Sequence, residues 1–429
     1  MDLFTTPQII SIVIFVGVFA LIISEKVHRT SAALAGAVLL WLMHIITFDQ
    51  GMEEIDFNTL GVLCGMMLFV AVAKQSGIFQ YLAIKAAKIA KGDPWKIMMY
   101  FVIITAVCSA FLDNVTTVLL ISPMTFTVCK ILDENPIPFF MTQILASNVG
   151  GTATLIGDPP NIMIGSGAGL TFADFINYDG IVCVIILAVF IAIFYFIYGR
   201  KLNSTPEARA IVMELNEQDA IKDRGLMHKS VGMILIVIVA FMLHGQLGLE
   251  SSMIALAAAA IMLLIGGQDI EEMILGVEWT TIGFFAGLFV VVGGMVQTGV
   301  IDMLAQALID VTGGDPILTM LVILIASAII SSILDNIPFT ATMIPIILYM
   351  GSQGMDVWPL WWALSLGACL GGNGTLIGAS ANVVLSGIST REGYPITFMS
   401  FLKVGMPMML VSVALAAVYL MIRFVWIGC

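Results

Sequence analysis

Long apolar stretches alternate with short polar segments along the whole chain. In the first half, stretches long enough or nearly long enough to cross a bilayer lie at residues 9–24, 31–47, 60–73 and 181–198. In the second half they lie at residues 230–249, 252–266, 280–295 and 406–425. Continuous apolar runs of this length are typical of membrane helices, so the pattern predicts an all-α polytopic membrane protein.

Two further pairs of apolar arms each meet at an Asp-Asn dipeptide. Residues 95–112 and 115–132 flank Asp113 and Asn114, and the second pair of arms meets at Asp335 and Asn336. Each pair is either two complete spans joined by a charged loop, or a re-entrant hairpin whose tip stays in the membrane.

Two more spans are interrupted by residues that disfavour a helix. Residues 139–168 contain SNVGGTATLIGDPPN, at 147–161, and residues 359–388 contain GGNGTLIGASANVV, at 371–384. Glycine lowers helix stability and proline removes a backbone donor, so we expect both spans to unwind there. Unwound backbone at membrane depth is tolerated only where it is buried in protein or lines a water-filled cavity. The two breaks therefore predict a binding region.

The second half repeats the order of the first. Asp113 pairs with Asp335 (335 − 113 = 222), and Asn161 pairs with Asn382 after a single-residue deletion (382 − 161 = 221). This spacing predicts a duplicated fold. We expect a first repeat, a charged cytoplasmic linker and a second repeat at residues 1–198, 199–229 and 230–429.

The distribution of Lys and Arg indicates how the repeats are oriented. With re-entrant hairpins each half crosses the membrane an odd number of times, which inverts the second half relative to the first. An N-terminus outside the cell then puts every Lys and Arg except Arg423 on or toward the cytoplasmic side. Residues 300–316, which contain three Asp and no Lys or Arg, fall outside. We therefore expect inverted repeats, each with five transmembrane spans, a re-entrant hairpin, a broken helix and an interfacial helix, the last at 78–90 and 300–311.

Composition narrows the class of protein. Of 429 residues, 60% are hydrophobic and 11% charged, and the mean hydropathy of +1.05 lies outside the range of soluble globular proteins. The net charge of −12 argues against nucleic-acid binding. The six cysteines show no C-x-x-C spacing, and the chain has no metal cluster, nucleotide loop or nucleophile motif, so we expect neither an enzyme nor a cofactor. The stretch at 9–24 lacks a basic n-region, so we expect a retained span.

The acidic residues of the hairpins and breaks are candidates for chemistry. A carboxylate at membrane depth is costly unless it is paired or functional, so Asp113 and Asp335 are predicted to bind a proton or a cation. They are also well placed to cap the helices that follow them, and both roles are compatible. Asp158 has no counterpart, because Ala379 occupies its position in the second half. It too either binds an ion or caps a helix that begins at the two prolines.

Neutral side chains complete the predicted site. Hydroxyls and amides coordinate solutes without a charge penalty, although each can instead satisfy the free backbone groups of an unwound segment. The candidate ion- and substrate-binding residues are Asp113, Asn114, Thr117, Asn148, Gly150, Gly151, Thr152, Thr154, Asp158, Asn161, Asp335, Asn336, Gly371, Gly372, Asn373, Thr375 and Asn382.

Four segments resemble a known family. SAFLDNVTTVLLISP (109–123), ILDNIPFTATMIP (333–345) and the two interrupted segments are similar to the signature segments of ArsB/NhaD-type permeases of the ion transporter superfamily. The branch resembled is that of arsenical-pump-like and pink-eyed dilution P-protein-like permeases, with a citrate-transporter-like domain. The resemblance implies hairpin tips at Asp113-Asn114 and Asp335-Asn336, and broken-helix loops at 150–161 and 371–382. It further implies a mobile transport domain that works as an elevator and a scaffold that forms a homodimer.

The resemblance leaves several solutes open. Carriers of citrate or dicarboxylates in this superfamily typically have Ser-Asn-Thr at the hairpin tips, whereas Asp113 and Asp335 would repel an anion unless protonated. We therefore expect a plasma-membrane antiporter that exports arsenite or a related metalloid in exchange for protons, with Na⁺/H⁺ antiport as the second hypothesis. A citrate carrier or an anion channel ranks below both. H⁺ or Na⁺ would be the coupling ion, and a soluble ATPase or regulator is left open as a partner.

Overall fold

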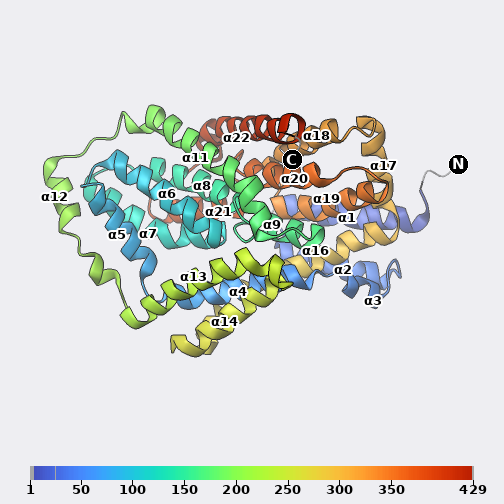
Figure 1. Cartoon of the computed structure of the whole chain (residues 1–429), viewed down its shortest axis with the longest axis horizontal. Helices are drawn as coiled ribbons and strands as arrows, with labels where there is room; N and C mark the ends of the chain where they lie inside the picture. Colours follow the sequence, from blue (N-terminus) through green and yellow to red (C-terminus); the bar gives the residue numbers. More distant parts are fainter. Residues whose placement is uncertain (1–3, 25, 428–429) are drawn as a thin grey trace.

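The computed structural model describes residues 4–24 and 26–427, and their regular structure consists of helices (Figure 1). The first half contains α1 (Thr6–Ser24), α2 (Arg29–Leu42), α3 (Phe48–Glu53), α4 (Phe57–Lys74), α5 (Ile78–Ile89), α6 (Pro94–Phe111), α7 (Asn114–Leu132), α8 (Pro136–Thr152), α9 (Pro159–Ala168), α10 (Phe172–Phe175), the π-helical turn η1 (Ile176–Gly180), α11 (Ile181–Phe194) and η2 (Tyr195–Gly199). The linker contains α12 (Pro206–Glu214) and η3 (Glu217–Ala220). The second half contains α13 (Arg224–Leu247), α14 (Ser251–Gly266), α15 (Ile270–Leu275), α16 (Trp279–Gln297), α17 (Val300–Thr312), α18 (Pro316–Ile333), α19 (Asn336–Ser352), α20 (Trp358–Gly371), α21 (Ser380–Arg391), α22 (Phe398–Met421) and η4 (Ile422–Ile427).

The two halves have the same order of helices, as the repeat predicts. Among the described residues, nine helices are long and apolar enough to cross a membrane, and α2 and α14 are shorter apolar helices. The predicted all-α polytopic fold is confirmed. α13 begins at Arg224, inside the segment expected to be linker, and the division into three domains stays a prediction.

Equivalent local signals start equivalent helices. α6 and α18 each begin with proline after an aspartate, and proline is tolerated in the first turn because its missing N–H has no partner there. Asp93 caps α6 by accepting from the Lys96 N–H at 3.1 Å, and Asp315 caps α18 by accepting from the Ile317 N–H at 2.8 Å. The hairpins therefore begin in the same way in both halves.

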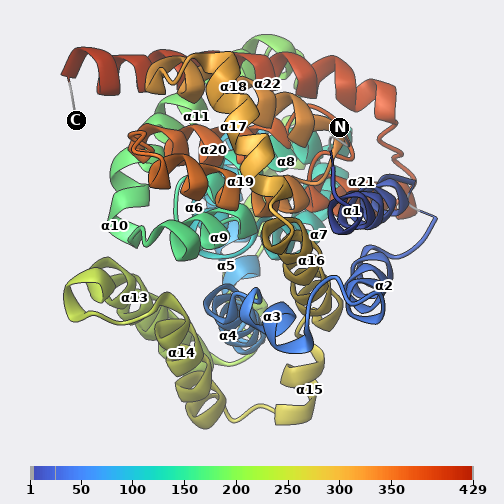
Figure 2. The same ribbon diagram turned by 90° about the vertical axis from the view of Figure 1, so that its right-hand side faces the viewer.

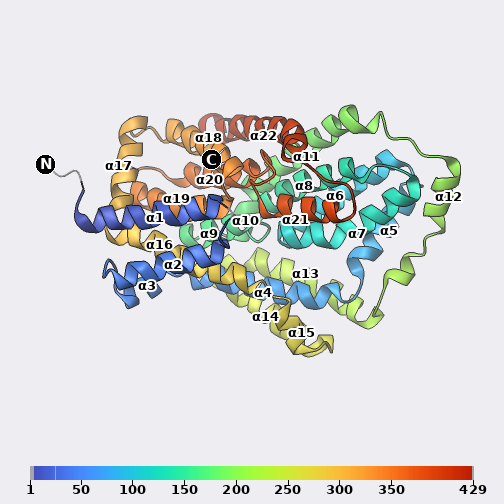
Figure 3. The same cartoon turned by 180° about the vertical axis from the view of Figure 1, so that it is seen from behind.

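The repeats are inverted relative to one another. Figures 1 and 3 show α5 at one end of the long axis and α17, its counterpart, at the other. The hairpins α6–α7 and α18–α19 follow α5 and α17, so they enter from opposite ends. Asn114 and Asn336, at the two tips, nevertheless line one cavity. This arrangement is that of two hairpins that turn back inside the molecule.

Two groups of helices can be distinguished (Figure 2). The scaffold layer consists of α1, α2, α4, α13, α14 and α16, and the hairpin bundle consists of α6–α9 and α18–α21. In both groups the halves interlock: α4 packs on α14 and α2 on α16, while α7 packs on α21 and α9 on α19.

Glycine allows the closest contacts in the scaffold layer. A Cβ at Gly65 of α4 would lie 2.5 Å from the backbone carbon of Ala255 in α14, and a Cβ at Gly287 of α16 would lie 2.8 Å from that of Ala33 in α2. Both members of one contact are displaced by the repeat spacing from those of the other (287 − 65 = 222; 255 − 33 = 222). Small residues that let backbones approach are typical of helix association in membranes, so the repeat extends to packing.

The linker is attached to the end of the molecule where α5 lies. The Lys88 ammonium is 2.6 Å from the Glu217 carboxylate, and the Lys222 N–H donates to the Ser76 carbonyl at 3.1 Å. The hydrogen bond from Lys88 holds the pKa of the Glu217 carboxyl below its usual value. These contacts tie the chain between the halves to the first repeat.

Candidate functional site

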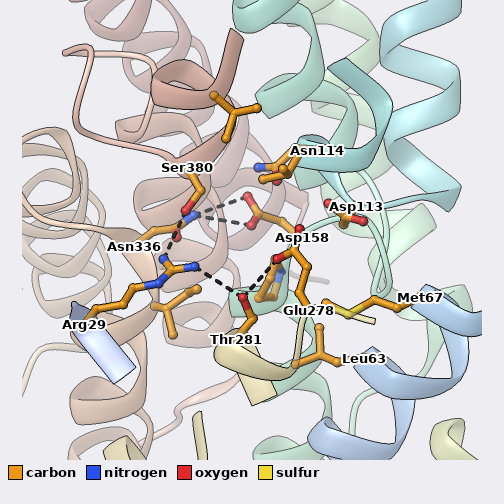
Figure 4. Close-up of a pocket in the computed structure, with 14 residues that line it drawn as sticks. Arg29, Leu63, Met67, Asp113, Asn114, Asp158, Glu278, Thr281, Asn336 and Ser380 are labelled. Carbon is orange, nitrogen blue, oxygen red and sulfur yellow. Dashed lines mark hydrogen bonds between the residues drawn. The ribbon is translucent and has the colours of Figure 1, made fainter. Parts of the chain in front are cut away.

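A cavity of about 120 Å³ lies between the scaffold layer and the hairpin bundle, at the tips of both hairpins (Figure 4). It is lined by Arg29, Leu63, Met67, Asp113, Asn114, Val115, Asp158, Pro159, Glu278, Thr281, Asn336, Ile337, Ser380 and Val384. The lining thus combines residues of both halves. Of the predicted site residues it includes Asp113, Asn114, Asp158 and Asn336.

The aspartates at the hairpin tips both cap helices. Asp113 accepts from the Thr116 N–H at 2.8 Å at the start of α7, and Asp335 accepts from the Ile337 N–H at 3.4 Å at the start of α19. Asp113 also lines the cavity, and Asp335 lines an adjoining cavity that shares Arg29. Helix capping and exposure to a cavity thus coexist at both tips.

Asp158 does not cap the helix that follows it. It precedes α9, but its side chain makes no capping hydrogen bond. The Asn336 amide instead donates to both Asp158 carboxylate oxygens, at 3.4 and 3.3 Å, and Figure 4 shows the two side chains facing one another across the cavity. Asp158 is 2% exposed. Its hydrogen-bond partner therefore belongs to the other half of the chain.

The asparagines of the broken helices hold the unwound segments together. The Asn161 amide donates to the carbonyls of Thr152 and Thr154 at 3.0 Å each, and to that of Gly151 at 3.4 Å. The Asn382 amide donates to the carbonyls of Gly372 and Thr375 at 2.7 and 2.9 Å. These side chains satisfy backbone groups that have no helical partner, which is the structural role left open by the sequence.

The threonines attach each unwound segment to the neighbouring hairpin. Thr154 donates to the Ala110 carbonyl, and its counterpart Thr375 donates to the Ser332 carbonyl at 2.5 Å. Thr152 donates to the Asn148 carbonyl at 2.7 Å within α8. All three hydroxyls are therefore engaged inside the bundle.

Asn148 joins the two breaks at the centre of the bundle. Its amide nitrogen donates to Asn373 at 2.9 Å and to Asn382 at 3.0 Å, and its oxygen accepts from Asn114 at 3.3 Å. A hairpin tip, a broken helix of the first half and a broken helix of the second half thus share one amide network. A movement of any one of them must rearrange the others.

The predicted glycines serve close packing and do not line the cavity. A Cβ at Gly150 would lie 2.1 Å from the Ala106 carbonyl oxygen, and one at Gly371 would lie 2.6 Å from that of Ala328. Gly151 and Gly372 each face the other end of their own break, at the carbonyls of Gly157 and Gly378. Thr117, also predicted, is buried in α7.

Arg29 is a cavity residue that the sequence did not single out. Its guanidinium donates to Asp335 at 2.7 Å, to Ser380 at 3.1 Å and to Thr281 at 3.4 Å, and it lies 5.0 Å from the centre of the Phe284 ring. α2 belongs to the scaffold layer, whereas Asp335 and Ser380 belong to the hairpin bundle. Arg29 therefore connects the two groups of helices across the cavity.

Glu278 and Thr281, at the start of α16, were missed as well. Thr281 donates to Glu278 at 3.0 Å, and both line the cavity beside Arg29. The only signal in the sequence is a charged residue directly before an apolar span, which is also what an ordinary interfacial anchor looks like.

Inverted hairpins, broken helices and a cavity whose lining includes carboxyl and amide groups of both halves are typical of a secondary membrane transporter. A protein-family model described as "Citrate transporter" matches residues 19–367, so the chain belongs to the citrate transporter family of the ion transporter superfamily.

Relatives include an uncharacterized transporter of Mycobacterium bovis, 45% identical over 97% of this chain and 99% of that protein. The human P protein is 34% identical over 99% of this chain, which spans 61% of the P protein's length. The resemblance to the P-protein branch is thereby confirmed.

A solved structure has the same fold. The crystal structure of the Alcanivorax borkumensis YdaH transporter, reported to have an unusual topology, aligns with a TM-score of 0.62 over 98% of this chain and 99% of that one. The two sequences are 16% identical, so the likeness shows a common fold.

Proposed function

We propose that the protein is a proton-coupled antiporter that exports a small hydroxylated metalloid such as arsenite. The acidic lining of the cavity is the observation that carries this proposal. Asp113, Asp158 and Glu278 line it, and Arg29, the cation among the lining residues, is already paired with Asp335. Such a site favours neutral or cationic solutes and provides carboxyl groups that can exchange protons.

The chemistry of arsenite matches this lining. Arsenite is a neutral hydroxide at physiological pH, so its hydroxyl groups can donate to carboxylate and amide oxygens without a net charge entering the site. A cavity of about 120 Å³ has room for several waters or for a solute of that size.

Citrate fits the cavity less well, although the family model carries its name. A trianion would meet Asp113, Asp158 and Glu278, with Arg29 already engaged by a carboxylate. Like charges at this distance disfavour binding unless protons neutralise them first. The carboxylates therefore argue for a solute without negative charge.

Sodium–proton exchange is the second candidate, and the ligand atoms of the cavity favour it. Asp113, Asp158, Glu278, Asn114 and Thr281 offer oxygen atoms. Hard cations such as Na⁺ prefer oxygen ligands, and a proton competing for the same carboxylates would couple the two fluxes.

The membrane arrangement is part of the proposal. The basic residues support a plasma-membrane protein with its N-terminus outside, and the two helix groups support a hairpin bundle that moves as an elevator against a dimeric scaffold. The coupling ion is H⁺, or Na⁺ under the second candidate, and no other cofactor is proposed. A soluble ATPase or regulator could bind at the cytoplasmic linker.

A solute screen tests the assignment. The purified protein is reconstituted into vesicles that contain a pH-sensitive dye, and arsenite, antimonite, Na⁺, Li⁺ and citrate are added one at a time. We expect arsenite and antimonite to drive proton movement that protein-free vesicles lack. A response to citrate alone would contradict the proposal, and a response to Na⁺ and Li⁺ alone would establish the second candidate instead.

A further inference from the structure

Asp179 is a buried acidic residue outside the cavity. It lies in η1, where the last span of the first half begins, and it is 0% exposed. Its Oδ2 lies 2.5 Å from the Ser365 hydroxyl oxygen of α20, and its Oδ1 has no hydrogen-bond partner among the described residues. A buried carboxylate with so few donors would be very costly in its charged form.

The hydrogen bonds around Ser365 show whether the Asp179 carboxyl group carries a proton. The Ser365 hydroxyl oxygen also lies 2.6 Å from Asn161 Oδ1. The amide nitrogen of Asn161 faces three backbone carbonyls, so its oxygen must face Ser365. Ser365 carries one hydroxyl proton but contacts two acceptor oxygens, and one proton cannot serve both. The second proton must come from the Asp179 carboxyl group, which donates to Ser365 while Ser365 donates to Asn161.

The charged and titratable groups around Asp179 leave it without an ion pair. Among the described residues no salt bridge includes it. Arg423 is the cation whose charge acts on Asp179, but it donates to the Asn177 carbonyl at 2.7 Å and to the Tyr419 hydroxyl at 2.6 Å, and it stacks 3.7 Å from the Tyr178 ring centre. The titratable groups that face Asp179 besides Arg423 are the Tyr419 hydroxyl of α22 and two thiols, Cys183 of α11 and Cys369 of α20.

Asp179 is specific to the first half. The sequence TFADFINYDG (171–180) corresponds to TFMSFLKVGM (397–406), which places Gly405 opposite Asp179. A Cβ at Gly405 would lie 2.5 Å from the Asn373 carbonyl oxygen, so the second half has no room for a side chain there. The carboxyl group therefore has no counterpart in the second half, and through Ser365 and Asn161 it is connected to the first half's break at residues 153–158, which also carries the unduplicated Asp158.

We propose that Asp179 is a proton-binding site outside the cavity. Its proton stabilises the unwound segment of the first half through the hydrogen bonds from Asp179 to Ser365 and from Ser365 to Asn161. If this proton were lost, the charged carboxylate would become the stronger acceptor for the Ser365 hydrogen. The Asn161 oxygen would then lose its closer donor and keep only the Cys369 thiol, whose sulfur lies 3.5 Å away, so the segment bearing Asp158 would become less ordered. The protonation state of Asp179 thus determines how well ordered the unwound segment of the first half is.

Infrared spectroscopy and hydrogen exchange on the full-length protein in lipid test this site. Asp179→Asn preserves a donor to Ser365, and Asp174→Asn, in α10 nearby, is the matched control because Asp174 accepts from Thr171 as a carboxylate would. We expect the carbonyl band of protonated carboxyl groups to lose intensity in Asp179→Asn and to keep it in Asp174→Asn. An unchanged band in Asp179→Asn would overturn the proposal.

The stabilising role is tested with Ser365→Ala, which removes the hydrogen bonds between Asp179, Ser365 and Asn161 but leaves every charged residue in place. Amide exchange in residues 153–158 should increase about tenfold in Ser365→Ala, as for the loss of one buried hydrogen bond. In Asp179→Asn it should stay near the wild-type rate. Equal exchange in Ser365→Ala and wild type would overturn the proposal. Neither measurement uses a solute or a flux, so a negative result here would leave the proposed transport function standing, and the reverse also holds.

Discussion

The side-chain amide of Asn336 donates to both carboxylate oxygens of Asp158, at 3.4 and 3.3 Å. A residue of the second half's hairpin tip thus binds an acidic residue that has no counterpart in the second half. Under the proposed function, contacts between the halves differ between the states of the transport cycle, and we therefore expect this pair to take part in coupling a proton to a solute.

We predict that Asp158→Ser abolishes proton-coupled flux. Serine can cap a helix but carries no charge, and Asp158 makes no capping hydrogen bond to lose. The expected loss is at least about tenfold, as for the removal of a charge that acts in the transport step. Asp315→Ser is the matched control, because Asp315 does cap its helix and serine preserves a cap, so its flux should stay near wild type. Wild-type flux in Asp158→Ser would show that the carboxylate is dispensable.

Asp113→Asn and Asp335→Asn should each stop proton coupling and still fold. Asparagine caps helices about as well as aspartate, so the starts of α7 and α19 should be preserved. Thermal unfolding in detergent checks the fold, and solute uptake with and without a pH gradient checks coupling. If both variants keep the wild-type response to the gradient, neither aspartate carries the coupled proton, and both have structural roles only.

Arg29 and Asp335 should show energetic coupling between the scaffold layer and the hairpin bundle. Their side chains are 27% and 17% exposed, so solvent screens the pair, and we expect about 1 kcal/mol in a double-mutant cycle with Arg29→Gln and Asp335→Asn. The cycle is measured by thermal unfolding. Arg391→Gln combined with Asp335→Asn is the control and should be additive, because Arg391 is in no ion pair among the residues described. Additivity in the Arg29 cycle would mean that the contact has no net effect on stability.

Cysteines at the hairpin tips should be shielded from bulk solvent. Val115 and Ile337 line the cavity. In a background without the native cysteines, Val115→Cys and Ile337→Cys should react slowly with a membrane-impermeant thiol reagent, and solute should protect them. Glu207→Cys, on the exposed face of α12, should react fast from the cytoplasmic side only. Fast labelling of Val115→Cys from outside without protection would contradict a re-entrant hairpin.

The fold was predictable because each of its signals is local. Apolar runs, the Asp-Pro starts of α6 and α18, and the glycines and prolines of the breaks act within one helix or one turn. The repeat then predicted how the helices are arranged, because residues 222 positions apart make equivalent contacts in the two halves (255 − 33 = 222).

The site was only partly predictable because its contacts join distant segments. Arg29 and Asp335 are 306 residues apart, and Asp179 and Ser365 are 186 apart. Neither Arg29 nor Asp179 differs locally from an ordinary interfacial charge. The breaks were recognised, but whether an asparagine in them faces a solute or a backbone carbonyl depends on how the chain folds back, as Asn161 shows.

Uptake of arsenite against its gradient tests the central claim most directly. Vesicles that contain the reconstituted protein are prepared with an acidic interior, and internal arsenite is measured over time for wild type and for Asp158→Asn. The account predicts that wild type accumulates arsenite until the pH gradient is collapsed with an ionophore, whereas Asp158→Asn only equilibrates or takes up none. Equal accumulation by both proteins, or no arsenite uptake by wild type while citrate accumulates, would contradict it.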